Sequence, residues 1–237
     1  PDFPPDGPRS WQRLALALIA GTISSIGMWS VVLVLPVVGD DFGVGRAEAS
    51  LPYTATMLGF AAGNLLLGRL VDAIGIARVL TLAGLTLGAG FALAALSPSI
   101  LIFAAIQGLM IGTATAAGFG PLMADVSHWF RRRRGIAVAI AASGNYLAGA
   151  IWPLALRPFL EAGDWRGAYL AIGAICALCL PALALLMRTR LSFAQIAANA
   201  PLRPGAGGSR ETGFSPRMLQ GLLAVAGSWV PALRASR

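Results

Sequence analysis

The residues of this sequence that could bind a solute are a few polar side chains set inside long apolar runs. An amide or phenol surrounded by lipid loses its hydrogen bonds, so each of these residues must face protein or a cavity. Hydrogen bonding between helices explains such residues in many proteins, and contact with a small polar substrate is the alternative. The candidates for a substrate pathway are Trp29, Tyr53, Asn64, Gln107, Asn145 and Tyr146.

Catalytic chemistry finds no support in the sequence. It contains no metal-ligand cluster, no nucleophile paired with a base and no phosphate-binding loop, so we expect no enzyme activity, no cofactor and no metal site. Ionisable residues, the usual mark of proton coupling in a membrane, are absent from the central turns of the apolar runs. Cys176 and Cys179 form a C-x-x-C pattern inside one such run, where small side chains that pack between helices are the simpler interpretation.

The elements that must position these side chains are membrane helices. Of the 237 residues, 57% are hydrophobic and 12% are charged, and the mean hydropathy is +0.73, whereas a soluble domain has roughly 25% charged residues. Only helices and closed barrels span a bilayer, and these runs do not alternate as barrel strands do. An all-α bundle of six transmembrane helices is therefore predicted, with Pro98 dividing the longest run. The expected spans are 14–38, 50–68, 79–96, 100–124, 135–156 and 167–187.

The basic residues indicate the orientation of the bundle. All 18 are arginine, and short cytoplasmic loops are enriched in basic residues. Up to residue 217, thirteen arginines fall on the side of the N-terminus, and only Arg46, Arg157 and Arg166 fall on the other. We therefore expect a multi-pass protein of the cell membrane with a cytoplasmic N-terminus, whose partner is the lipid bilayer and not nucleic acid.

The chain divides into four parts by composition. Residues 1–13 form a polar cytoplasmic leader, residues 14–188 form the helix bundle, and residues 189–217 form a flexible linker rich in Pro, Gly, Ser and Arg. Residues 218–237 begin with a short apolar run that contains Pro231. We expect this last segment to be the truncated start of a seventh helix, whose continuation is missing.

The connection expected between the second and third helices carries a specific pattern. It resembles the loop signature of the major facilitator superfamily, G-x-L-x-D-x-x-G-R-[RK], in Gly68, Leu70, Asp72 and Gly75, with Arg78 as the remaining basic residue. The departures from the signature are Ala73, Ile76 and Ala77, which stand where basic residues are usual. Glycines let helix ends turn tightly, and the carboxylate can bind a helix N-terminus or an arginine. The resemblance implies that these residues act in gating.

Three further segments narrow the resemblance to one part of this superfamily. Residues 129–135 place an aromatic pair, four arginines and a glycine before the fifth expected helix, and Asp164-Trp165-Arg166 stands before the sixth. Together with residues 42–50, they are similar to the monocarboxylate transporters and the oxalate/formate antiporters. The resemblance runs from about residue 14 to residue 188.

The resemblance implies a larger architecture than this chain supplies. Members of the superfamily have twelve helices in two six-helix halves, with the substrate held between the halves near the middle of the membrane. Asp125, near the end of the fourth helix, would join the loop signature in a charge cluster that controls gating. An ordinary pair with Arg131 or Arg132 at the membrane surface is the alternative. Pro36 and Pro121 are expected to break the first and fourth helices and let them bend.

The function that follows from the resemblance is transport. We expect the N-terminal half of a secondary transporter that moves a small organic anion, such as a monocarboxylate, by alternating access. The missing half would come from a second six-helix unit or from a second copy of this chain. The alternatives are a truncated membrane protein that does not transport, and a six-helix channel or scaffold.

Overall fold

The computed structural model of the protein describes residues 4–189 and residue 195. Almost all of the expected linker, and the whole of the expected seventh segment, 218–237, lie outside the described residues.

Every regular element in the described part of the chain is helical, and the helices group into six spans that are long and apolar enough to cross a membrane. This confirms the predicted all-α bundle. The first two spans consist of α1 (Pro8–Ser24) with α2 (Ile26–Asp41), and α3 (Arg46–Ala49) with α4 (Leu51–Ile74). The third is α5 (Ile76–Ala95), the fifth α9 (Arg134–Glu161) and the sixth α10 (Trp165–Leu186). The fourth runs through α6 (Ile100–Ile106), the π-helix η1 (Gln107–Gly112), α7 (Thr113–Thr115), the 3₁₀-helix η2 (Ala116–Gly118) and α8 (Gly120–Trp129).

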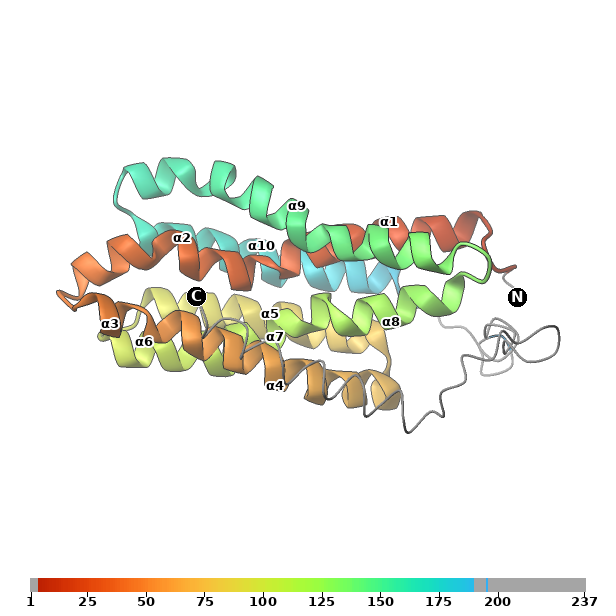
Figure 1. Ribbon diagram of the computed structural model, residues 1–237, viewed down its shortest axis with the longest axis horizontal. Coiled ribbons are helices and arrows are strands. Elements are labelled where there is room, and N and C mark those ends of the chain that lie inside the picture. Colours follow the sequence, from red (N-terminus) through yellow and green to blue (C-terminus); the bar gives the residue numbers. More distant parts are fainter. Residues whose placement is uncertain (1–3, 190–194, 196–237) are drawn as a thin grey trace, which may run out of the picture. The chain divides into compact units, whose positions relative to one another are not determined.

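The six spans run alternately up and down in one bundle (Figure 1). The start of α1, the α4–α5 turn and the α8–α9 connection lie at one end, which we call the arginine-rich end because Arg13, Arg78 and Arg131–Arg134 lie there. Helix α5 packs along α10, α1 packs along α9, and α4 packs along η1. Helices α4 and α9 lie at opposite edges of the bundle in this view.

Glycines allow α4 to approach the fourth span until the two backbones touch. Gly59 and Gly63 of α4 form one G-x-x-x-G pair, and Gly108 and Gly112 of η1 form another. A Cβ added to Gly59 would meet the carbonyl oxygen of Gly108, and a Cβ added to Gly112 would meet that of Thr56. Between membrane helices, such close packing supplies attraction that lipid does not.

A second glycine pair brings α5 against α10. A Cβ on Gly84 would lie 2.7 Å from the Cβ of Leu180, and one on Gly88 would lie 2.6 Å from the Cβ of Ala177. Cys176 is buried in this interface, and both it and Cys179 are free thiols. Their place in the structure is in line with a packing role.

The first and fourth spans are both broken; the first is broken away from its proline, and the fourth is broken beside its proline. Pro36 lies inside α2, and the first span is interrupted instead at Ser25, between α1 and α2. Contact with the fourth span accounts for this position, because the Ser24 hydroxyl donates to the carbonyl of Thr115 and Gly27 packs against the Thr115 side chain. Pro121 falls in the first turn of α8, just after the break at Phe119, a position that proline tolerates.

The connection between α4 and α5 is shorter than the loop signature suggests. Helix α4 continues to Ile74 and α5 begins at Ile76, so Gly75 alone makes the turn. Its φ of 84° and ψ of 157° belong to a region that is essentially restricted to glycine. Gly68, by contrast, lies within α4, and an added Cβ there would meet no atom within 4 Å.

The two signature glycines should therefore respond differently to alanine. Gly75→Ala is expected to lower the free energy of unfolding by about 1–3 kcal/mol, because alanine is strained in this conformation. Gly68→Ala should raise it by roughly 0.5–1 kcal/mol, since alanine favours a helix over glycine. Thermal unfolding of both variants in detergent, followed by circular dichroism, measures the difference. Equal melting temperatures would contradict the backbone argument.

Candidate functional site

Two of the predicted pathway residues meet between α2 and α9. The indole Nε1 of Trp29 donates to the backbone carbonyl of Asn145 at 3.1 Å, and the ring packs against Gly149, where a Cβ would lie 2.8 Å from it. The Asn145 side-chain amide has no hydrogen-bond partner in the described part of the chain and is half-buried. The next residue, Tyr146, is 75% exposed. We call Trp29, Asn145 and Tyr146 the α9 group.

Two other candidates lie on α4, away from the α9 group. The Asn64 amide donates to the carbonyl of Phe60 on its own helix at 2.9 Å, and its side-chain oxygen lies beside Gly120 at the start of α8. Tyr53 is 43% exposed. Helices α4 and α9 lie at opposite edges of the bundle in the view of Figure 1, and no hydrogen bond within the described part of the chain joins Tyr53 or Asn64 to the α9 group.

Gln107 points into the bundle and not toward its surface. It is fully buried, and its Nε2 donates to the hydroxyl of Tyr169 on α10 at 2.6 Å. Ser30 of α2 lies beside the same hydroxyl. Neither the Gln107 Oε1 nor the Ser30 Oγ has a hydrogen-bond partner among the residues described. These three residues form a buried polar cluster that joins the first, fourth and sixth spans.

The polar cluster coincides with an irregular stretch of the fourth span. The π-helix η1 begins at Gln107, and the Thr113 hydroxyl accordingly donates to the carbonyl of Gly108, five residues back. π-Helical turns, which put an extra residue into the helical ladder, are rare in proteins. Where they occur, they are often found at functional sites. No feature of the sequence predicts this turn, although Gln107 is among the candidate pathway residues.

A buried ion pair joins three helices at the arginine-rich end. Arg13 of α1 binds Asp125 of α8 with both ends of its guanidinium, at 2.8 Å from Nε to Oδ2 and 3.0 Å from Nη2 to Oδ1. The side chains are 4% and 16% exposed. Arg13 also donates to the carbonyls of Met187 and Thr189 just after α10, and its guanidinium lies 5.2 Å from the centre of the Trp129 ring. One side chain thus fixes the ends of the first, fourth and sixth spans.

The expected partners of Asp125 were different. The sequence offered Arg131, Arg132 or the loop signature, whereas the structure pairs Asp125 with Arg13. The composition predicts that Arg13 belongs to a polar leader, but α1 begins at Pro8 and already includes it. A pairing between residues 112 positions apart has no local signal in the sequence.

The loop signature itself is free of contacts with charged groups of the bundle. Asp72 and Arg78 are exposed, and neither has a hydrogen bond or ion pair with any residue that the structure describes. Leu70 packs against the edge of the core. Asp72 and Arg78 can therefore form ion pairs or hydrogen bonds with groups outside the described part of the chain.

The four consecutive arginines are held by the segment before α1. The Asp6 carboxylate accepts hydrogen bonds from the backbone N–H groups of Arg131, Arg132 and Arg133, at 3.3, 3.0 and 3.1 Å. Slight burial tends to raise the pKa of Asp6, but these hydrogen bonds outweigh it and hold that pKa below the ordinary value. The side chains of these three arginines remain exposed, as expected for groups that face lipid headgroups.

At the opposite end of the bundle, the segment Asp164-Trp165-Arg166 links the start of α10 to the end of α2. The Asp164 carboxylate accepts from the backbone N–H of Gly167 at 2.8 Å and so caps α10. Trp165 is buried, and its indole and the Arg166 guanidinium both donate to Asp41 at the end of α2. Among the residues described, no three His, Cys, Asp or Glu side chains gather as they would around a metal ion.

Comparisons with known proteins point to one family. The profile of the Major Facilitator Superfamily matches residues 17–233. Monocarboxylate transporter 11 of Mus musculus is 29% identical over 233 residues, which cover 98% of this chain and 52% of that protein. The MFS-type transporter pytF of Aspergillus terreus is 31% identical over 163 residues, covering 65% of this chain and 53% of the relative.

A bacterial relative is more distant. The probable sulfoacetate transporter SauU of Cupriavidus necator is 25% identical over 154 residues, covering 65% of this chain and 36% of that protein. The chain thus spans about half the length, or less, of these curated relatives.

Proposed function

This chain belongs to the major facilitator superfamily, and from that premise we propose that its bundle is the N-terminal half of a secondary transporter for a small organic anion. The family points to a transporter and not to an enzyme. In such a protein the substrate binds between two six-helix bundles that rock about it. The length of one relative supports the proposal, because the 233 residues matched to monocarboxylate transporter 11 of Mus musculus cover 98% of this chain and only 52% of that protein.

The observation that carries the proposal is the contrast between two exposed surfaces. Burial alone does not separate these surfaces, since α10 is 33% buried in its most apolar stretch, while the span that contains α4 is 11% buried and α9 is 28% buried. Both helices expose tyrosines, Tyr53 and Tyr146, together with leucines. The exposed residues within the apolar parts of α5 and α10 are leucine, isoleucine and alanine alone. The α4 and α9 faces therefore fit a protein partner, and the α5 and α10 faces fit lipid.

The substrate class rests on the names of relatives and on the α9 group. Monocarboxylates and sulfoacetate, named for two relatives, are both small anions that contain a carboxylate. The Asn145 amide and the Tyr146 hydroxyl can each donate a hydrogen bond to such a group. No cation lies in the central turns of these spans, so the positive charge that binds the anion would come from the second bundle.

The proposed assembly predicts that a lone bundle does not transport. Purified chain would be reconstituted into liposomes, its mass determined in detergent, and the uptake of labelled lactate, oxalate and formate measured. Saturable uptake is expected only from a dimer or from the chain joined to a second half. Saturable uptake by a confirmed monomer would rule out the two-bundle proposal.

In an assembly that transports, Asn145→Ala should raise KM about tenfold or more, since it removes a hydrogen bond to a charged group. Ser143→Ala, on the same helix, is the matched control because its hydroxyl donates to the carbonyl of Ile140. An equal effect of the two substitutions would remove Asn145 from the proposed site.

We also propose that the arginine-rich end faces the cytoplasm, because basic residues favour that side. Single cysteines at positions 99 and 133, in a chain with Cys176 and Cys179 replaced by alanine, test this orientation. An impermeant maleimide should label position 99 in intact cells and leave position 133 unlabelled. The reverse pattern would invert the topology.

A further inference from the structure

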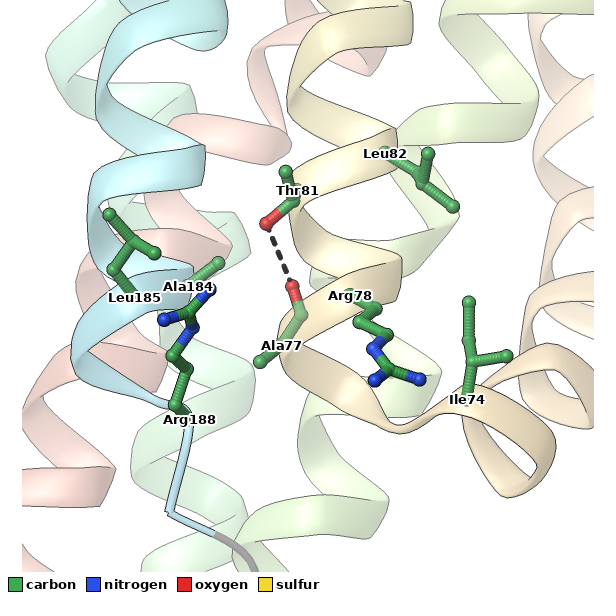
Figure 2. A pocket seen from close by; sticks show the side chains of 8 residues that line it. All are labelled: Ile74, Ala77, Arg78, Thr81, Leu82, Ala184, Leu185 and Arg188. Atoms are coloured by element: carbon green, nitrogen blue, oxygen red, sulfur yellow. Dashed lines mark hydrogen bonds between the residues drawn. The ribbon is translucent and has the colours of Figure 1, made fainter.

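A cavity of about 580 Å³ opens on the outer face of the bundle, between α5 and the end of α10. Arg78 of α5 and Arg188, just after α10, border it, and Figure 2 shows them on either side of Ala77 and Thr81. Leu82 and Leu185 form part of its wall. We call this cavity the α5–α10 groove. It lies at the arginine-rich end, where Ile74, the last residue of α4, and Arg78 of the loop signature also line it, and it includes no residue of the α9 group.

The two arginines give the groove an uncompensated positive charge. Both side chains are exposed, and neither guanidinium has a hydrogen bond or an ion pair within the described ranges, 4–189 and 195. None of the described residues that line the groove is acidic. An arginine stays charged at any physiological pH and pairs well with phosphate. A ligand that fits this end of the groove must therefore be an anion.

The rest of the groove is apolar and opens onto a surface suited to lipid. Ile74, Leu82, Ala184 and Leu185 line it, and among the described residues of its lining the only polar side chain besides the arginines is that of Thr81. The Thr81 hydroxyl already donates to the carbonyl of Ala77 at 3.0 Å, as Figure 2 shows. The exposed residues farther along α5 and α10 are apolar as well. A soluble anion would leave this wall uncovered, whereas an acyl chain would cover it.

From this charge and shape we propose that the α5–α10 groove binds one anionic phospholipid, with its phosphate between Arg78 and Arg188 and an acyl chain along Leu82 and Leu185. Basic pockets between membrane helices are suited to acidic headgroups, and each arginine near such a surface contributes to the affinity. This site is separate from the proposed substrate path and does not depend on transport.

Native mass spectrometry of the full chain in detergent, titrated with phosphatidylglycerol, tests the proposal. One bound phosphatidylglycerol is expected to be retained. Phosphatidylcholine, which has no net charge, should have an affinity lower by about tenfold or more. The double variant Arg78→Gln/Arg188→Gln should weaken phosphatidylglycerol binding about tenfold or more. Equal retention of the two lipids by the unmodified chain would overturn the proposal.

A charge-matched variant separates the groove from general electrostatic attraction. Arg69→Gln/Arg132→Gln also removes two positive charges, from exposed positions at the same end of the bundle that lie outside the groove. It should leave phosphatidylglycerol binding unchanged within about twofold. Equal losses in the two double variants would show that only the overall charge matters. All four positions are exposed, and unchanged thermal unfolding would show that both variants are folded.

Two further arms distinguish a lipid from a free phosphate. Glycerol 3-phosphate carries a phosphate without acyl chains, and at equal concentration it should not displace phosphatidylglycerol. Leu82→Asn/Leu185→Asn, which keeps both arginines, should weaken phosphatidylglycerol binding severalfold because it removes the apolar wall. Displacement of phosphatidylglycerol by glycerol 3-phosphate would assign the groove to a soluble anion. Unchanged phosphatidylglycerol binding by Leu82→Asn/Leu185→Asn would show that the apolar wall does not bind an acyl chain. Either result would overturn the phospholipid proposal.

Discussion

Asp125→Asn is expected to lower the free energy of unfolding of the bundle by about 3–5 kcal/mol. The substitution keeps the shape of the side chain and removes its charge, so Arg13 is left charged at 4% exposure. Breaking a buried pair on one side costs more than the pair itself contributes, since the remaining charge stays desolvated. Unfolding in detergent micelles with increasing denaturant, followed by circular dichroism, measures the loss.

Two controls make this prediction specific. Glu161→Gln breaks the pair with Arg157, whose side chains are 70% and 64% exposed, and should cost less than about 1 kcal/mol. Arg13→Gln/Asp125→Asn removes both charges and should recover part of the stability lost in Asp125→Asn. If the double variant is less stable than Asp125→Asn, the remaining contacts of Arg13 outweigh the ion pair. A loss in Asp125→Asn no larger than that in Glu161→Gln would contradict the buried-pair argument.

Gly59→Leu should destabilise the bundle by about 3 kcal/mol or more. A Cβ at this position meets the carbonyl oxygen and carbon of Gly108, and backbone atoms cannot move aside as the end of a flexible side chain can. The helices α4 and η1 must then separate, and the contacts along the paired glycines are lost. The same unfolding measurement in detergent gives the effect.

Gly68→Leu provides the comparison for Gly59→Leu on the same helix. No atom lies within 4 Å of a Cβ at Gly68, so leucine there should not lower the free energy of unfolding and, like alanine, should raise it by up to about 1 kcal/mol, since it favours a helix over glycine. If both variants lose a similar amount of unfolding free energy, the stability of α4 depends on its glycines for a reason other than backbone contact with η1.

The sequence predicted the helices well because lipid imposes a simple requirement on each span. An apolar run such as 135–156 has to form a helix, since no other open segment satisfies its backbone in hydrocarbon. Gly75 could also be assigned to a turn from the signature alone. These features depend on local composition, which a single sequence contains.

The features that the sequence did not predict depend on contacts between distant residues. The first span is interrupted at Ser25 and not at Pro36, because Ser24 and Gly27 contact the fourth span around Thr115. The sequence predicts that Arg13 lies in the polar leader, but the approach of α8 and the end of α10 buries it. Tyr169 was missed as well, although a tyrosine in the sixth apolar run could have suggested a partner such as Gln107.

The π-helix of the fourth span also has a mechanical consequence. Its extra residue makes η1 a dislocation in the helical ladder of the fourth span, and a shift of this dislocation requires only that the neighbouring turns exchange hydrogen bonds. A dislocation that passes a residue turns that residue about the helix axis by one residue's share of a turn, about 100°. Gln107 would thereby leave the hydroxyl of Tyr169 and face another side of the span, with no helix unfolded. Faster hydrogen exchange at the amides of residues 107–113 than in the rest of the fourth span would report such motion, and uniform protection would exclude it.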